Sequence, residues 1–105
     1  MGLSVDRKVI WSEEAKQDLA EAASYIGRDS KYYQSTFVSQ VLSSSYSLCF
    51  FSERGCIVPE LKEPSVREVF VGKYRLIYSV RSQEVVIIAL IHGARDLKKA
   101  LEERH

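Results

Sequence analysis

The first half of the chain predicts one short strand followed by a pair of helices. Residues 8–11 are β-branched and aromatic, which is typical of a strand. Ser12 then offers an N-cap, and apolar residues recur at helical spacing over residues 13–26. A second helix is predicted over residues 31–49, and the short connection between the two predicts an αα-hairpin. The expected apolar stripe of the second helix consists of Tyr33, Phe37, Val41 and Leu48, widened by Val38 and Leu42.

The second half of the chain predicts an antiparallel sheet. Residues 66–71 and 74–80 are strand-like runs on either side of Gly72-Lys73, a glycine-first pair suited to a type II′ hairpin. Residues 85–91 are apolar at successive positions, which indicates an interior strand covered on both faces.

The predicted elements follow one another in the order β-α-α-β-β-β(-α). Residues 52–65 form a loop ahead of the sheet, and residues 96–104 predict a short terminal helix. We therefore expect a single α+β domain over residues 1–105, with the helical hairpin packed on one face of a small, mainly antiparallel sheet. A chain of this length buries roughly two-thirds of its unfolded surface, which is enough for a core of its own.

The register of the central hairpin decides which charged side chains share a face of the sheet. With a two-residue loop, Arg75 lies opposite Phe70 and shares a face with Glu68, whereas Arg67 points to the other face. With a three-residue loop, Arg67 and Arg75 share one face. A slip of one residue exchanges the two faces, and the sequence leaves both registers open.

Charge and apolar runs limit the classes of function. The net charge of +1 argues against strong, purely electrostatic binding to nucleic acid. A basic surface is expected only in residues 51–105, which contain ten basic and eight acidic residues. The longest apolar run is too short to span a bilayer, and the N-terminus lacks the layout of a signal peptide. The spacing of Cys49 and Cys56 is not that of a zinc site. We expect a cytoplasmic protein with no metal, no small-molecule cofactor and no membrane contact.

Five side chains at the edges of the apolar framework could carry chemistry. Arg67 and Arg75 lie in predicted strands, where an arginine is either a rigidly held ligand for an anion or a solvated cross-strand partner. His92 ends the apolar strand and is the residue best suited to acid–base chemistry near neutral pH. Glu60 follows a proline in the middle loop as a potential base partner, and Arg95 follows the last strand. The sequence shows no glycine-rich phosphate loop, nucleophile elbow or dinucleotide fingerprint.

Several short segments, spread over the chain from Trp11 to Asp96, stand in an order and spacing that is similar to one protein family. The segments are Gly55, residues 58–61 (VPEL), residues 66–69 (VREV), residues 71–78 (VGKYRLIY) and residues 92–96 (HGARD). Together they resemble the RelE/ParE superfamily of type II toxin–antitoxin toxins. The resemblance implies a bacterial growth inhibitor, of the kind linked to plasmid stabilisation, that is neutralised by a small antitoxin from the same operon.

One activity implied by the resemblance is the ribosome-dependent mRNA cleavage of RelE-like members. Laid on this sequence, the RelE pattern keeps Arg75 and Arg95, but its terminal tyrosine falls near Leu101. Its two strand lysines fall on Val66 and Glu68. A carboxylate at the place of the substrate phosphate is unfavourable because the two charges repel each other.

Another nuclease subgroup uses a glutamate, an arginine and a histidine, to which Glu60, Arg75 and His92 correspond, although its tyrosine is replaced by Gly93. The VPEL, Arg-Glu and HGxRD pieces instead look like the ParE side, whose members are described as DNA gyrase poisons without a nuclease site.

We therefore expect a ParE-like toxin, not an enzyme, that binds gyrase by protein–protein contact. Its expected target-binding residues are Arg67, Arg75, His92 and Arg95. The first alternative is an mRNA endonuclease with Glu60, Arg75 and His92 as catalytic residues. The second is an inactive member of the family that only binds its antitoxin.

Overall fold

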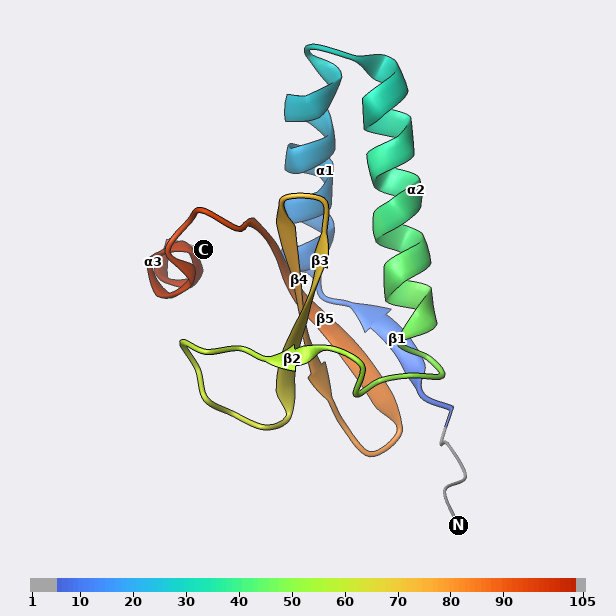
Figure 1. The fold of residues 1–105 in the computed structure, drawn as a ribbon, viewed down its shortest axis with the longest axis vertical. Coiled ribbons are helices and arrows are strands. Elements are labelled where there is room, and N and C mark those ends of the chain that lie inside the picture. The colour runs from blue at the N-terminus through green and yellow to red at the C-terminus, as the bar shows by residue number, and fades with distance from the viewer. Residues whose placement is uncertain (1–5, 104–105) are drawn as a thin grey trace.

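Two helices pack on one face of a five-stranded sheet, and a short third helix lies on the other side (Figure 1). The computed structural model describes residues 6–103. The elements are β1 (Lys8–Trp11), α1 (Glu13–Gly27), α2 (Lys31–Ser47), β2 (Cys56–Ile57), β3 (Val66–Val71), β4 (Tyr74–Val80), β5 (Glu84–His92) and α3 (Leu97–Glu102). The strand order is β1-β5-β4-β3-β2; β1 runs parallel to β5 and the other neighbours are antiparallel. The expected α+β class and helical hairpin are confirmed.

Serine side chains begin both long helices. The Ser12 hydroxyl accepts the Ala15 N–H at 3.1 Å, and the Ser30 hydroxyl accepts the Tyr33 N–H at 3.1 Å. Each bond satisfies one backbone donor that the first helical turn leaves without a partner inside the helix. The boundaries of the hairpin could therefore be read from local chemistry.

The apolar stripe predicted for α2 is partly wrong. Phe37, Val41 and Leu48 are buried, but Tyr33 is 65% exposed and Leu42 is 47% exposed. The buried face of the helix has Val41 at its centre and includes the residues four positions before and after it. Successive residues of a helix are turned by about 100°, so Tyr33 and Leu42 lie about 80–100° away from this centre. Two large apolar side chains therefore lie on the solvent side of α2.

Strand β5 contributes side chains to the cores on both faces of the sheet, and it contains a bulge. Ile77 of β4 pairs with Ala89, whereas the next residue, Tyr78, pairs with Ile87, so Ile88 is an additional residue in β5. The bulge shifts the alternation of side chains by one position. Upstream of it Ile87 faces the core beneath α1 and α2, and downstream of it Ala89 faces the smaller core beneath α3. The expected strand covered on both faces is confirmed.

The hairpin between β3 and β4 has the two-residue loop. Val71 pairs with Tyr74, and Gly72 has a φ of +58°, a conformation that glycine adopts without strain. Arg75 therefore lies opposite Phe70, and the three-residue register is excluded.

Several predicted segments differ in their bounds. The second helix, expected over residues 31–49, ends at Ser47. The expected loop over 52–65 contains the short strand β2, in which Cys56 pairs with Glu68. The terminal helix covers Leu97–Glu102, because the Asp96 side chain accepts the Lys99 N–H as an N-cap. Residue 104, the expected last residue of this helix, lies outside the described residues. Within residues 6–103, no helix is long and apolar enough to cross a membrane.

Candidate functional site

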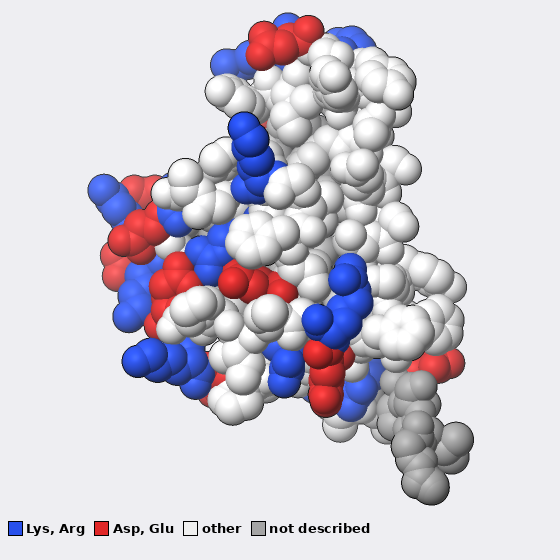
Figure 2. Space-filling model, viewed as in Figure 1, with Lys and Arg blue, Asp and Glu red and all other residues white. Residues whose placement is uncertain are grey.

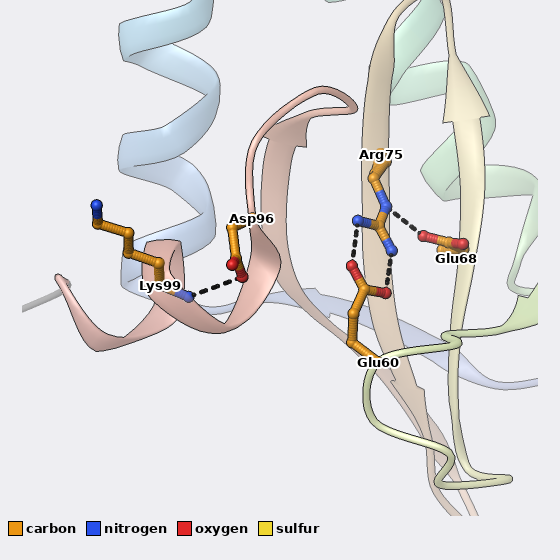
Figure 3. A network of polar contacts seen from close by, with 5 residues as sticks. All are labelled: Glu60, Glu68, Arg75, Asp96 and Lys99. Atoms are coloured by element: carbon orange, nitrogen blue, oxygen red, sulfur yellow. Dashed lines mark hydrogen bonds and ion pairs between the residues drawn. The ribbon is translucent and has the colours of Figure 1, made fainter.

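Glu60, Glu68 and Arg75 form an ion triad on the face of the sheet that α3 also covers (Figure 3). The Arg75 Nε donates to Glu68 Oε1 at 2.6 Å. Its Nη1 and Nη2 donate to the two carboxylate oxygens of Glu60 at 2.9 and 2.8 Å, a bidentate contact. Arg75 is 6% exposed and Glu68 is 8% exposed, whereas the Glu60 side chain is 31% exposed. All three guanidinium nitrogens therefore already donate to a carboxylate.

The triad follows from the register and from a tight turn. Glu68 and Arg75 share a face because β3 and β4 pair with a two-residue loop. Glu60 is placed above them by the segment after Val58, a fully buried residue whose carbonyl accepts the N–H groups of Leu61 and Lys62 at 3.2 and 3.0 Å. A buried anchor and a turn thus hold a loop carboxylate over the middle of the sheet.

The contact between Glu60 and Arg75 shifts the pKa values of these two groups in opposite directions. The hydrogen bonds from Arg75 lower the pKa of Glu60 to about 2, against a smaller opposing effect of burial. The hydrogen bonds to Glu60 raise the pKa of Arg75 above its ordinary value, with a further contribution from Glu68. Two carboxylates surround one guanidinium, so the cluster carries one net negative charge. An incoming phosphate would have to displace a carboxylate to reach Arg75.

His92 lies on the opposite face of the sheet from this triad. It pairs with Tyr74 in the register of β4 and β5, and its ring meets the Tyr74 ring edge-on with 5.3 Å between the ring centroids. Tyr74 packs against the core beneath the two long helices, while the neighbouring Arg75 points to the other face. The Ala94 N–H donates to His92 Nδ1 at 3.2 Å. The structure brings Glu60 and Arg75 together but leaves His92 apart from them.

The surroundings of His92 are acidic. It lines a groove of about 720 Å³ between α1, the end of β5 and α3. Four carboxylates also line this groove, contributed by Glu14, Asp18, Glu21 and Glu103. Burial raises the pKa of the Tyr74 hydroxyl in the same groove. This lining is more suited to a cationic or neutral group than to a phosphate.

The two remaining arginines make contacts of their own. Arg67 Nη1 donates to the carbonyl oxygens of Gly55 and Glu53 at 2.9 and 3.4 Å and so ties the strand to the loop before β2. Arg95 pairs with Glu103 at 2.9 Å, and both side chains are about half exposed. A surface pair of this kind contributes little to stability and leaves Arg95 accessible to a partner.

The structural roles of two polar residues were not predicted from the sequence. One of the two registers places Glu68 on the face of Arg75, but its role as the buried partner of Arg75 was not predicted. Asp18 on α1 accepts the Leu90 N–H at 3.0 Å and so joins the helix to the sheet. The contact of Glu68 with Arg75 could have been predicted from the two-residue register. The contact of Asp18 joins residues 72 positions apart, and no local sequence pattern predicts such a contact.

The arrangement of a helical hairpin on a mainly antiparallel sheet is shared with a known structure. The structure is similar to that of a chain from the chromosomal ParDE toxin–antitoxin system of P. aeruginosa, with a TM-score of 0.68 over 82% of this chain and 95% of that chain. Sequence identity is 17%, so this likeness concerns the fold alone. No curated protein sequence matches the chain.

A family model described as the ParE toxin of the type II toxin–antitoxin system parDE matches residues 9–97. The chain therefore belongs to the ParE toxin family, within the RelE/ParE superfamily that the sequence motifs indicated. It is the toxin component of a type II toxin–antitoxin system, and such a component has an antitoxin as its partner.

Proposed function

We propose that this toxin acts in the cytoplasm by binding DNA gyrase through its protein surface, and that its cognate antitoxin blocks this contact. The observation that carries the proposal is the saturation of Arg75 by Glu60 and Glu68. A sheet arginine that is 6% exposed and held by two carboxylates is a poor ligand for RNA phosphate. The gyrase target is the one implied by the resemblance to ParE-like members.

The alternative, an mRNA endonuclease using Glu60, Arg75 and His92, is less well supported. Acid–base catalysis is most effective when the pKa of the catalytic group is near the working pH, and the pKa of Glu60 is about 2. A catalytic pair must also lie within hydrogen-bond reach of one reacting phosphate. Glu60 and His92 lie on opposite faces of the sheet and do not meet this condition in the present arrangement.

Of the four proposed target-binding residues, Arg95 is the most accessible. Its side chain is 55% exposed, and its pairing with Glu103 is readily exchanged for a partner carboxylate. His92, beside it in the groove, is half-buried. Arg75 and Arg67 contribute mainly by holding the sheet and the loop in shape.

The proposal is tested by adding the purified toxin separately to gyrase with relaxed plasmid and to translating ribosomes. We expect inhibition of supercoiling or gyrase-dependent DNA breaks, intact mRNA, and reversal by the antitoxin. Arg95→Ala should weaken the effect on gyrase. Arg81→Ala, which removes an exposed arginine at the other end of the sheet, is the matched control and should leave the effect unchanged.

Two outcomes contradict the proposal. Codon-phased mRNA cleavage that disappears with His92→Gln would establish the endonuclease. Antitoxin binding without any effect in either assay would establish a family member that only binds its antitoxin.

A further inference from the structure

The outward face of α2 lacks charge and exposes aromatic side chains. Within Lys31–Ser47 the single charged residue is Lys31, although 28% of the whole chain is charged. Six exposed residues lie within about 100° of one another around the helix. They are Tyr32, Ser35, Ser39, Leu42, Ser43 and Tyr46, here called the α2 face. Figure 2 shows the flank over α2 as white below the tip of the hairpin, while most of the charged atoms lie at the tip and in the lower left and lower middle of the view.

Large aromatic side chains extend the α2 face beyond the C-terminal end of the helix. Tyr46 stacks edge-on with Phe50 at 5.9 Å between ring centroids, and Phe50 meets Phe51 at 6.5 Å. Phe51 is 63% exposed, and Tyr46 is 65% exposed. Charge depletion combined with exposed tyrosine and phenylalanine is the composition of an interface core rather than of a solvated surface.

Five of the six residues of the α2 face are arranged symmetrically about Ser39, and Leu42 is the exception. Tyr32 and Tyr46 lie seven residues before and after this serine, and Ser35 and Ser43 lie four residues before and after it. An interface between two identical chains related by a two-fold axis must be self-complementary. In an antiparallel pair of α2 helices, Tyr32 of one chain meets Tyr46 of the other, and the serines between them allow the backbones to approach closely.

We propose that the α2 face joins two copies of this chain in an antiparallel helix pair, with Ser39 at the two-fold axis. A face without charge can meet its own copy without repulsion. The contact spans ~21 Å along the helix, from Tyr32 to Tyr46. The exposed parts of its large side chains, Phe50 and Phe51 included, amount to roughly 400–700 Å² per chain. With the serines and helix backbone this approaches the ~800 Å² that each partner buries in a stable interface.

The first test is the mass of the purified full-length toxin, free of antitoxin, by sedimentation equilibrium. We expect a concentration-dependent mass that rises toward twice the 12.0 kDa of one chain. Tyr46→Glu should raise the dissociation constant at least about tenfold, because it places two like charges in the interface. Tyr25→Glu is the matched control: Tyr25 is 64% exposed but lies on α1, outside the α2 face, and should leave the mass unchanged.

The second test probes the symmetry by disulfide trapping in a chain with Cys49→Ser and Cys56→Ser. Where the axes of two packed helices lie about 8–10 Å apart, the Cα atoms that face each other across the contact are close enough for a disulfide. Ser39→Cys should therefore link to itself under mild oxidation. Ser35→Cys should not link to itself but should link to Ser43→Cys when the two variants are mixed.

Three results would overturn the proposal. One is a monomeric mass at all concentrations. Another is self-linking of Ser35→Cys as fast as that of Ser39→Cys. The third is a monomer in which Tyr46→Glu abolishes binding of the antitoxin, since the α2 face would then belong to the antitoxin.

Discussion

Replacing Glu60 by glutamine removes the loop carboxylate of the ion triad and should destabilise the folded protein by about 1–2 kcal/mol at pH 7. Arg75 lowers the pKa of Glu60 from an ordinary value of 4.5 to about 2. At 1.36 kcal/mol for each pKa unit, this difference corresponds to at most about 3 kcal/mol. Because the Glu60 side chain is 31% exposed, screening by water reduces this upper limit, and we expect a loss of about 1–2 kcal/mol.

The sign of the pH dependence follows from the lowered pKa of Glu60. The folded state favours the charged carboxylate, so its contribution is complete above pH 4.5 and is lost as the pH falls toward 2. By pH 3 less than about half of it remains. The gap in stability between the wild-type protein and Glu60→Gln should therefore narrow steadily below pH 4.5.

Urea unfolding of both proteins between pH 7 and pH 3 measures this gap directly. Glu63→Gln is the matched control, because it removes an exposed carboxylate from the same loop and should change stability by less than about 0.5 kcal/mol. Equal stability of Glu60→Gln and wild type at pH 7 would refute the assignment of the triad as a stabilising contact. A gap that stays constant down to pH 3 would refute its electrostatic origin.

Three further substitutions test the scaffold around the site. Gly55→Ala places a methyl group 2.5 Å from both the Glu68 carbonyl oxygen and the Tyr78 hydroxyl, and we expect a loss of about 1–3 kcal/mol in thermal unfolding. Gly72→Ala forces a side chain into a φ of +58° and should cost about 1–2 kcal/mol, with Gly72→Asn closer to wild type in the same assay. Asp96→Ala removes the N-cap of α3 and should lower stability by about 0.5–2 kcal/mol, with faster amide exchange at the start of that helix. Unchanged stability of any of these variants would contradict the local geometry that it tests.

Local chemistry made most of the fold predictable from the sequence. The N-cap serines begin both long helices at the expected residues, and Gly72-Lys73 forms a two-residue turn, one of the two registers that the sequence left open. The expected strand over residues 85–91 also lies within β5. Each of these features depends on residues within a few positions of one another. Periodicity and turn chemistry are sufficient for such features.

Long-range geometry could not be read in the same way. Tyr33 and Leu42 fit an apolar stripe, but which side of α2 is buried depends on how it packs against α1 and the sheet. The bulge at Ile88 exchanges the faces of β5 midway, and no residue type in an apolar run marks its place.

The candidate site was predictable in its members but not in its connections. Glu60 and Arg75 were both expected as site residues, and the structure joins them in one bidentate contact. The addition of Glu68 and the separation of His92 follow from the register and from the alternation of strand side chains. A one-residue slip between β3 and β4 would have separated Glu68 from Arg75, and a one-residue slip between β4 and β5 would have placed His92 on the same face as Arg75.

The most direct test of the account is titration of purified toxin into a gyrase supercoiling reaction, with the antitoxin and His92→Gln as the two comparisons. We predict that supercoiling falls with toxin concentration and that equimolar antitoxin restores it. His92→Gln should inhibit at a concentration within about threefold of wild type, because no acid–base step is involved and glutamine keeps a polar side chain for the contact with the target. Undiminished supercoiling at toxin concentrations that cleave mRNA on ribosomes, with that cleavage lost in His92→Gln, would contradict the account.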